Sequence, residues 1–220
     1  MLSRGKIGGK KLEFEGFSAK DFDIFKIDGL EERMEAIKGQ VRPKFELLGQ
    51  HFTPLLTVKT GQEMFYHIAK HARRTVNPPK DTWIAWSDNK RGYKMVPHFQ
   101  VGLWPTHLFV WFAIIYEAPS KGILGTKFLE NVQKIKQMIP EDFVWSFDHT
   151  KPESYPNRVL SEEDLSHAFA NLANKRKSEI LCGITIDRED PILQEPAHLL
   201  KKIEETFQIV LPLYTMDHGK

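Results

Sequence analysis

The stretch PHFQVGLWPTHLFVWFAIIY, residues 97–116, decides the fold of this chain. It holds two runs rich in β-branched and aromatic residues, separated by Pro105, and this pattern predicts two strands joined by a tight turn at residues 104–107. Successive side chains of a strand point to opposite faces of a sheet. Pairing Leu103 with Leu108 therefore predicts which side chains of the hairpin share a face.

The predicted hairpin has two unlike faces. On the first face Phe99 lies opposite Phe112 and Val101 lies opposite Val110, so we expect this face to pack into the core. The second face mixes polar groups, a glycine and large aromatic side chains: His98 opposite Ala113, Gln100 opposite Trp111, and Gly102 opposite Phe109. This second face is where we expect a ligand to sit.

Strands before the hairpin extend it into an antiparallel meander through residues 63–116. Residues 82–87 form a predicted strand, and a turn at residues 89–92 returns the chain towards the hairpin. The segment of residues 60–74 fits two structures. Its first four residues form a capping-box pattern that could begin a helix, but the segment FYHIA suits a strand, which we favour.

Helices are predicted on both sides of this strand-rich part. Ser18 and Asp21 form a capping-box pattern that opens the first helix, and a longer helix follows over residues 30–48 with a kink or break at Pro43. Further elements are helices at residues 128–139, 161–173 and 199–210, and strands at residues 142–147 and 179–186. The order of elements favours an α+β fold with a largely antiparallel sheet packed against helices.

Composition excludes several classes of protein. The chain has 220 residues, 41% of them apolar and 27% charged, with a formal net charge of +2, which is typical of a globular protein. Its longest apolar run, residues 108–116, is about half the length of a membrane helix. Cys182 is the only cysteine, so neither a disulfide within the chain nor a cysteine-based zinc site can form. We expect a cytoplasmic protein with no membrane partner.

Residues 1–16 are rich in glycine and lysine, which predicts a disordered basic N-terminal arm. Residues 17–220 are expected to form a single α+β domain. The arm adds to a mild basic bias in the first half of the chain, well short of the dense clusters that mark a dedicated nucleic-acid binder. Association with nucleic acid is therefore expected to be weak at most and salt-sensitive, mostly through the arm.

A basic segment near the start of the meander is the first candidate site. It places His67, Lys70, His71, Arg73 and Arg74 within eight residues. Arginine offers a planar fork of donors that matches phosphate or carboxylate, so the segment is a candidate anion site; the alternative is a solvated charged edge. The two histidines stand close enough to share a metal only on a helix, and we assign no metal site and no cofactor.

The second candidate site lies on the polar and aromatic face of the hairpin. His98, Gln100 and Trp111 share this face, and Trp83 joins them from the neighbouring strand. Apolar walls with a few orienting polar groups are typical of a small-molecule site, and indole rings beside cationic groups suit a flat anionic ligand such as a nucleotide. The alternative is a sheet face covered by a helix, with its polar groups hydrogen-bonded internally.

Several strings of the sequence resemble the YktB-like family of uncharacterised bacterial cytosolic proteins. They are AKHARRTVNPP at residues 69–79, DTW at 81–83, HFQVGLW at 98–104, HLFVWFAIIYE at 107–117 and LCGITIDRE at 181–189. The resemblance extends over nearly everything from about residue 17 to residue 214. It implies an α+β fold and a cytoplasmic location, but no activity, cofactor or catalytic residue.

Two functional hypotheses follow from these residues. The first is a module that binds a small anionic, phosphate-bearing ligand through the basic segment and the second face of the hairpin. The second is a hydrolase or transferase that acts on a phosphate-bearing substrate with His71 or His98 as general base, because histidine titrates near neutral pH. The sequence contains no glycine-rich phosphate loop, nucleophile elbow or dinucleotide fingerprint.

Overall fold

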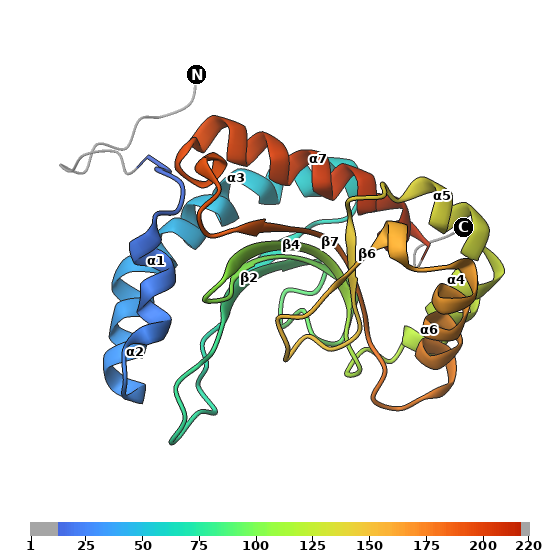
Figure 1. The fold of residues 1–220 in the computed structure, drawn as a ribbon, viewed down its shortest axis with the longest axis horizontal. Coiled ribbons are helices and arrows are strands. Elements are labelled where there is room, and N and C mark those ends of the chain that lie inside the picture. Colours follow the sequence, from blue (N-terminus) through green and yellow to red (C-terminus); the bar gives the residue numbers. More distant parts are fainter. Residues whose placement is uncertain (1–12, 217–220) are drawn as a thin grey trace.

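A computed structural model of the protein describes residues 13–216 (Figure 1). Most of the predicted N-terminal arm, residues 1–12, lies outside the described residues. Within the described part, one seven-stranded sheet has the order β1-β2-β3-β4-β7-β5-β6, and all of its neighbouring strands are antiparallel. The strands are β1 Phe65–Ile68, β2 Thr82–Ser87, β3 His98–Leu103, β4 His107–Ile114, β5 Val144–Ser146, β6 Tyr155–Pro156 and β7 Ile180–Asp187.

The structure confirms the α+β fold and the predicted hairpin register. Leu103 pairs with Leu108, and the remaining pairs of β3 and β4 follow from it as the alternation of side chains requires. The segment that fitted both helix and strand contains β1, which pairs with β2 and completes the four-stranded meander. β4 is an interior strand, because β3 and β7 lie on its two sides.

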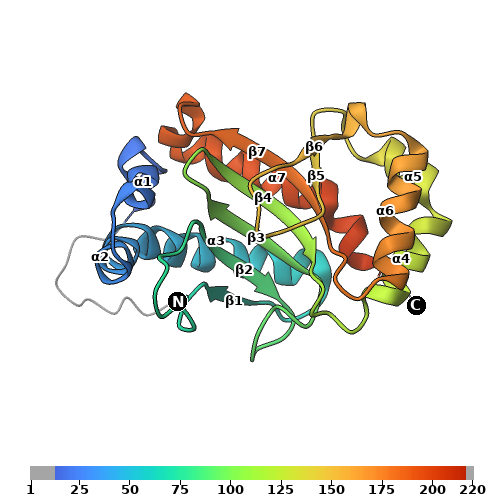
Figure 2. The same ribbon diagram turned by 60° about the horizontal axis from the view of Figure 1, so that its bottom comes forward.

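Helices cover one face of the sheet. Figure 1 shows the sheet arching beneath α3 and α7, and loops cross the opposite, concave side. α1 and α2 lie at one end of the molecule, whereas α4, α5 and α6 gather at the other (Figure 2). The helices are α1 Ala19–Asp23, α2 Leu30–Ala36, α3 Arg42–Thr60, α4 Lys121–Glu130, α5 Val132–Met138, α6 Glu162–Asn174 and α7 Pro196–Thr215. No helix in the described part of the chain has both the length and the apolar character needed to cross a bilayer.

Two helix predictions were wrong in their extent. The helix expected at residues 30–48 is interrupted by a π-helical turn over Ile37–Val41, just before Pro43, whose ring nitrogen cannot donate the regular hydrogen bond. It then continues to Thr60, which therefore ends a helix rather than capping a new one. The helix expected at residues 128–139 consists of α4 and α5, separated at Asn131.

The apolar face of the hairpin packs into the core, as predicted. Phe99, Val101, Val110 and Phe112 are fully buried under the helices. At the centre of this layer the ring of Phe207 on α7 lies 5.2 to 5.7 Å from those of three aromatic residues, Phe52, Trp86 and Phe99. Helices thus cover one face of the sheet, whereas the other face carries side chains of mixed character and is crossed by loops.

Candidate functional site

The concave face of the sheet carries the polar and aromatic side chains that the hairpin register predicts. Gly102 has room for no side chain, because a Cβ atom there would lie 2.2 Å from the ring of Phe109 and 2.7 Å from Cβ of Trp83. The missing side chain leaves space beside β3 for the rings of Phe109 and Trp83. Together with Trp104, Trp111, Val144 and Leu181, these rings form a second apolar cluster, separate from the main core.

A basic groove runs along the β1 edge of the concave face. We define it by the side chains that line its cavity of about 910 Å³, which include all of the basic segment and Trp83. Six of the lining residues are lysine or arginine, whereas one, Glu46, is acidic. The six are Arg42, Lys70, Arg73, Arg74, Arg91 and Lys94. Three segments distant in sequence thus supply positive charge to one groove.

Several groove residues are already held by neighbours. Glu46 accepts a hydrogen bond of 2.8 Å from the Tyr66 hydroxyl, and Lys94 pairs with Glu117 at 3.4 Å. The guanidinium of Arg42 donates long hydrogen bonds to backbone carbonyls, but its buried Nε has no acceptor among the described residues. The groove therefore contains more donors than acceptors.

The two histidines of the basic segment have different partners. His67 donates from Nε2 to the Asn89 carbonyl at 2.9 Å, whereas Nε2 of His71 lies 3.2 Å from the Thr82 hydroxyl. His71 has a φ of 52° and is the one non-glycine residue with positive φ in the described part of the chain. Burial, followed by the charges of Arg74 and Arg42, lowers its pKa to about 4. His71 is therefore neutral at physiological pH.

A smaller aromatic pocket lies beside the basic groove and shares Trp83 with it. Its walls include Trp104, Phe109 and Trp111, and its polar lining includes Gln100. The pocket encloses a cavity of about 20 Å³, which is enough for roughly one water molecule. Its full lining is Asp81, Trp83, Gln100, Trp104, Phe109, Trp111, Ser146, His149, Lys151, Pro152 and Leu181.

His98 lies behind this pocket and not on its wall. Its side chain is fully buried; Nδ1 donates to the Val96 carbonyl at 2.8 Å, and Nε2 accepts from the Gln100 amide at 2.8 Å. Burial lowers the pKa of His98 to about 4 and outweighs the backbone hydrogen bond that favours the charged form. His98 is thus a neutral residue that orients Gln100, and both of its ring nitrogens are occupied.

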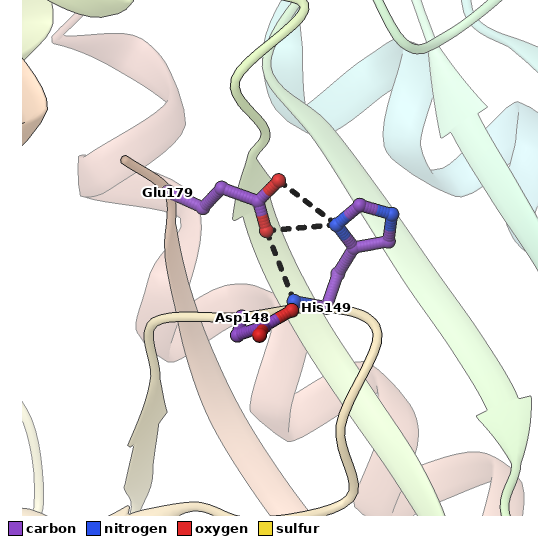
Figure 3. A group of neighbouring side chains, drawn as sticks. All are labelled: Asp148, His149 and Glu179. Atoms are coloured by element: carbon purple, nitrogen blue, oxygen red, sulfur yellow. Dashed lines mark hydrogen bonds and ion pairs between the residues drawn. The ribbon is translucent and has the colours of Figure 1, made fainter. Parts of the chain in front are cut away.

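His149, which lines the aromatic pocket, forms a hydrogen-bonded pair with Glu179 (Figure 3). Nδ1 of His149 lies 2.7 Å from one carboxylate oxygen of Glu179 and 2.9 Å from the other, and the backbone amide of His149 donates to the same carboxylate. Glu179 is 5% exposed. Nε2 of His149 points away from Glu179 and has no hydrogen-bond partner within the described residues.

Asp148 lies beside this pair, and one potential ligand atom from each of Asp148, His149 and Glu179 falls within 4.8 Å of the others. The Asp148 carboxylate, however, accepts hydrogen bonds from the backbone amide and hydroxyl of Thr150 and pairs with Lys151. Nδ1 of His149, in turn, is bonded to Glu179. Each of the three potential ligand groups is therefore already hydrogen-bonded to another protein group. We interpret the cluster as a hydrogen-bonded pair next to an Asp-initiated turn.

Comparison with known proteins identifies the family. A family model described as "Domain of unknown function (DUF1054)" matches residues 17–214. The chain belongs to the DUF1054 family. It is 50% identical over 205 residues to UPF0637 proteins of Bacillus cereus, Bacillus thuringiensis and Bacillus anthracis, which covers 93% of this chain and 99% of each relative. The resemblance predicted from the sequence strings is thereby confirmed.

The structure of this DUF1054 chain divides the predicted site residues into three groups. His67, Lys70, His71, Arg73 and Arg74 line the basic groove, and Trp83 stands between groove and aromatic pocket. Gln100 and Trp111 line the pocket, and His98 supports it from behind. Sequence reasoning missed three polar residues near these sites: Asp81, His149 and Glu179. No local motif marks them, because Asp81 precedes β2, His149 follows β5 and Glu179 precedes β7, and it is the pairing of the sheet strands that brings these segments together.

Proposed function

We propose that this protein binds a small phosphate-bearing ligand in the basic groove. The observation that carries the proposal is the charge of the lining, six cationic side chains against one carboxylate. Arginine forks bind phosphate through pairs of charge-assisted hydrogen bonds, which are stronger than neutral ones. The unpartnered Nε of Arg42 and the strained backbone of His71 support the same location.

The size and composition of the groove indicate a ligand of nucleotide size. Its volume of about 910 Å³ lies within the range of small-molecule sites. Tyr93 and Trp83 lie along the wall and are joined by a hydrogen bond of 2.8 Å from the indole nitrogen to the phenol oxygen. This bond fixes two aromatic surfaces beside the positive charges, so a planar group attached to the phosphate can stack there.

Binding is testable with adenosine monophosphate, pyrophosphate and the uncharged nucleoside adenosine. We expect the two anions, at 100 times their dissociation constants, to stabilise the protein by about 2.7 kcal/mol in thermal unfolding. The exposed side chain of Arg73 makes no hydrogen bond or ion pair within the described residues, so Arg73→Gln should leave the fold intact. Loss of one charge-assisted contact should weaken anion binding about tenfold or more.

The matched control is Arg158→Gln, which removes an exposed arginine that lines neither the groove nor the aromatic pocket. It should bind the anions as the natural protein does. Equal weakening by both substitutions would indicate only a general effect of charge, and tight binding of adenosine would show that phosphate is not the recognised group. Either result contradicts the proposal.

A further inference from the structure

We propose that the protein hydrolyses a phosphate ester, with Asp81 as general base and His149, oriented by Glu179, as general acid. The inference rests on the proposed function, because the basic groove would hold the phosphate. It goes further by assigning a reaction to the aromatic pocket, and it replaces His71 and His98 as the candidate titrating residues. Asp81 and His149 line one small cavity, and Glu179 is hydrogen-bonded to His149.

The His149–Glu179 pair has the geometry of an oriented acid–base group. A carboxylate bonded to Nδ1 fixes the tautomer and orientation of the ring, so that Nε2 is the atom that exchanges a proton. Here Glu179 is buried and also accepts the backbone amides of Tyr116 and His149, so its own position is fixed. His149 lines the aromatic pocket, and its Nε2 is the ring nitrogen left for a substrate (Figure 3).

Asp81 lines the same pocket and lies next to the basic groove. The loop that carries it is anchored by buried Arg33, which donates to the carbonyls of Ile27 and Pro79 at 2.7 to 2.9 Å. Asp81 is 9% exposed and forms no ion pair with any described residue. The pocket cavity has room for one water molecule in contact with this lining. A nucleophilic water, its base and its acid therefore fit within one pocket.

Electrostatics assigns the two roles. Burial raises the pKa of Asp81 to about 6, although the charges of Arg74 and His149 oppose the shift. Burial lowers the pKa of His149, but the hydrogen bond with Glu179 and the negative charge of Glu179 raise it by more. Smaller effects come from the charge of Lys94, which lowers this pKa, and from that of Asp81, which raises it. The net result is a raised pKa for His149. Because the pKa of Asp81 is about 6 and that of His149 is raised above its usual 6.5, there is a pH interval above 6 in which Asp81 is ionised and His149 is protonated, the forms that a base and an acid require.

The reaction balances without a further reactant. Asp81 removes a proton from water, and the water oxygen forms a bond to phosphorus. The bond between phosphorus and the leaving ester oxygen breaks, and Nε2 of His149 gives its proton to that oxygen. The products are an alcohol and a phosphate with one ester bond fewer, and exchange with solvent returns the proton from Asp81 to His149. Arg74 lines the groove, and its charge lowers the pKa of Asp81, so we assign Arg74 to hold the phosphate.

The test uses the full chain with phenyl and p-nitrophenyl esters of phosphate, each as monoester and diester. We expect hydrolysis of at least one pair. In Asp81→Asn, kcat/KM should fall about 100-fold or more for both esters of that pair, and in His149→Gln it should fall as much for the phenyl ester. Nitrophenolate leaves without protonation, so His149→Gln should impair the phenyl ester far more than the p-nitrophenyl ester. Asp81→Asn should impair both equally, because activation of water does not depend on the leaving group.

Glu179 acts through His149 and is tested as a positioning residue. The pH profile of kcat/KM should be bell-shaped, with its acidic limb near pH 6 from Asp81. Glu179→Gln should move the alkaline limb to lower pH, because the carboxylate raises the pKa of His149. The control is His198→Gln, which disrupts a similar bond of 2.6 Å to Glu195 on the exposed surface of α7 and should change nothing.

The outcomes separate this inference from the proposed function. If the natural protein binds pyrophosphate but hydrolyses none of the four esters, the acid–base inference is wrong and the binding proposal stands. Hydrolysis of the phenyl ester that survives in Asp81→Asn and His149→Gln, when circular dichroism shows both variants folded, also contradicts it. If either variant fails to fold, the pH profile of kcat/KM for the natural protein is the deciding measurement. A profile without the limb near pH 6 overturns the acid–base inference. Absence of both binding and hydrolysis overturns both proposals.

Discussion

Replacing Phe207 by alanine is expected to lower the free energy of unfolding by about 3–5 kcal/mol. Phe207 is 1% exposed, and its ring lies 5.5 Å from that of Phe52, 5.7 Å from that of Trp86 and 5.2 Å from that of Phe99. Its removal leaves a cavity bounded by three large rings on one helix and the sheet. Such rings cannot collapse into the space without leaving their own contacts, so the cost should lie in the upper part of the usual range.

The measurement is urea unfolding followed by circular dichroism, with linear extrapolation to water. Ile123→Ala is the control, because Ile123 on α4 is 64% exposed and its truncation should change stability by about 0.5 kcal/mol or less. A loss below about 1 kcal/mol for Phe207→Ala would mean that α7 does not pack on the sheet as described. The concave face would then lack a rigid support.

The fold was predictable from sequence wherever apolar side chains recur at one regular spacing, such as every second residue of a strand. Phe99, Val101, Val110 and Phe112 alternate with the polar and aromatic set, and a shift of register by one residue would expose all four; the observed pairing is therefore the one predicted. Helix boundaries were less predictable. The irregularity predicted at Pro43, a kink or break, is present as the π-helical turn just before it, but the helix then resumes and also contains Pro54. Burial of Phe52 and Leu56 on its core face favours continuation of the helix through this second proline.

The basic groove was predictable in part because half of it is local in sequence. Lys70, Arg73 and Arg74 stand out as a cluster along the chain, whereas Arg42, Arg91 and Lys94 reach the groove from two other segments. The pair of His149 and Glu179 was not predictable in this way. Thirty residues separate them, and the pairing of β5 with β7 brings them together. A single sequence records no such contact, so an isolated histidine in a loop carries no signal.

The largest pH effect is expected on the acidic side of neutrality. His71, His98 and His107 all have pKa values lowered to about 4, with burial as the main cause in each. A histidine that is neutral when folded contributes stability that is present above its unfolded pKa near 6.5 and is lost as pH falls towards the folded value. For fully buried His98 alone, this linkage amounts to about 2 kcal/mol between pH 7 and pH 5. Raised pKa values at Asp81 and His149 act in the opposite direction.

Comparison of variants separates the contribution of His98 to the pH dependence of stability from the contributions of these other groups. The natural protein and His98→Gln should be unfolded with urea at pH 7 and at pH 5. We expect His98→Gln to be less stable at pH 7, since it loses buried contacts with Val96 and Gln100, but to lose about 2 kcal/mol less than the natural protein on going to pH 5. The control His198→Gln changes a 72% exposed side chain and should retain the natural pH dependence. An equal loss in His98→Gln and the natural protein would mean that His98 is accessible to protons in the folded state. Gln100 would then not be held at the pocket by a neutral imidazole.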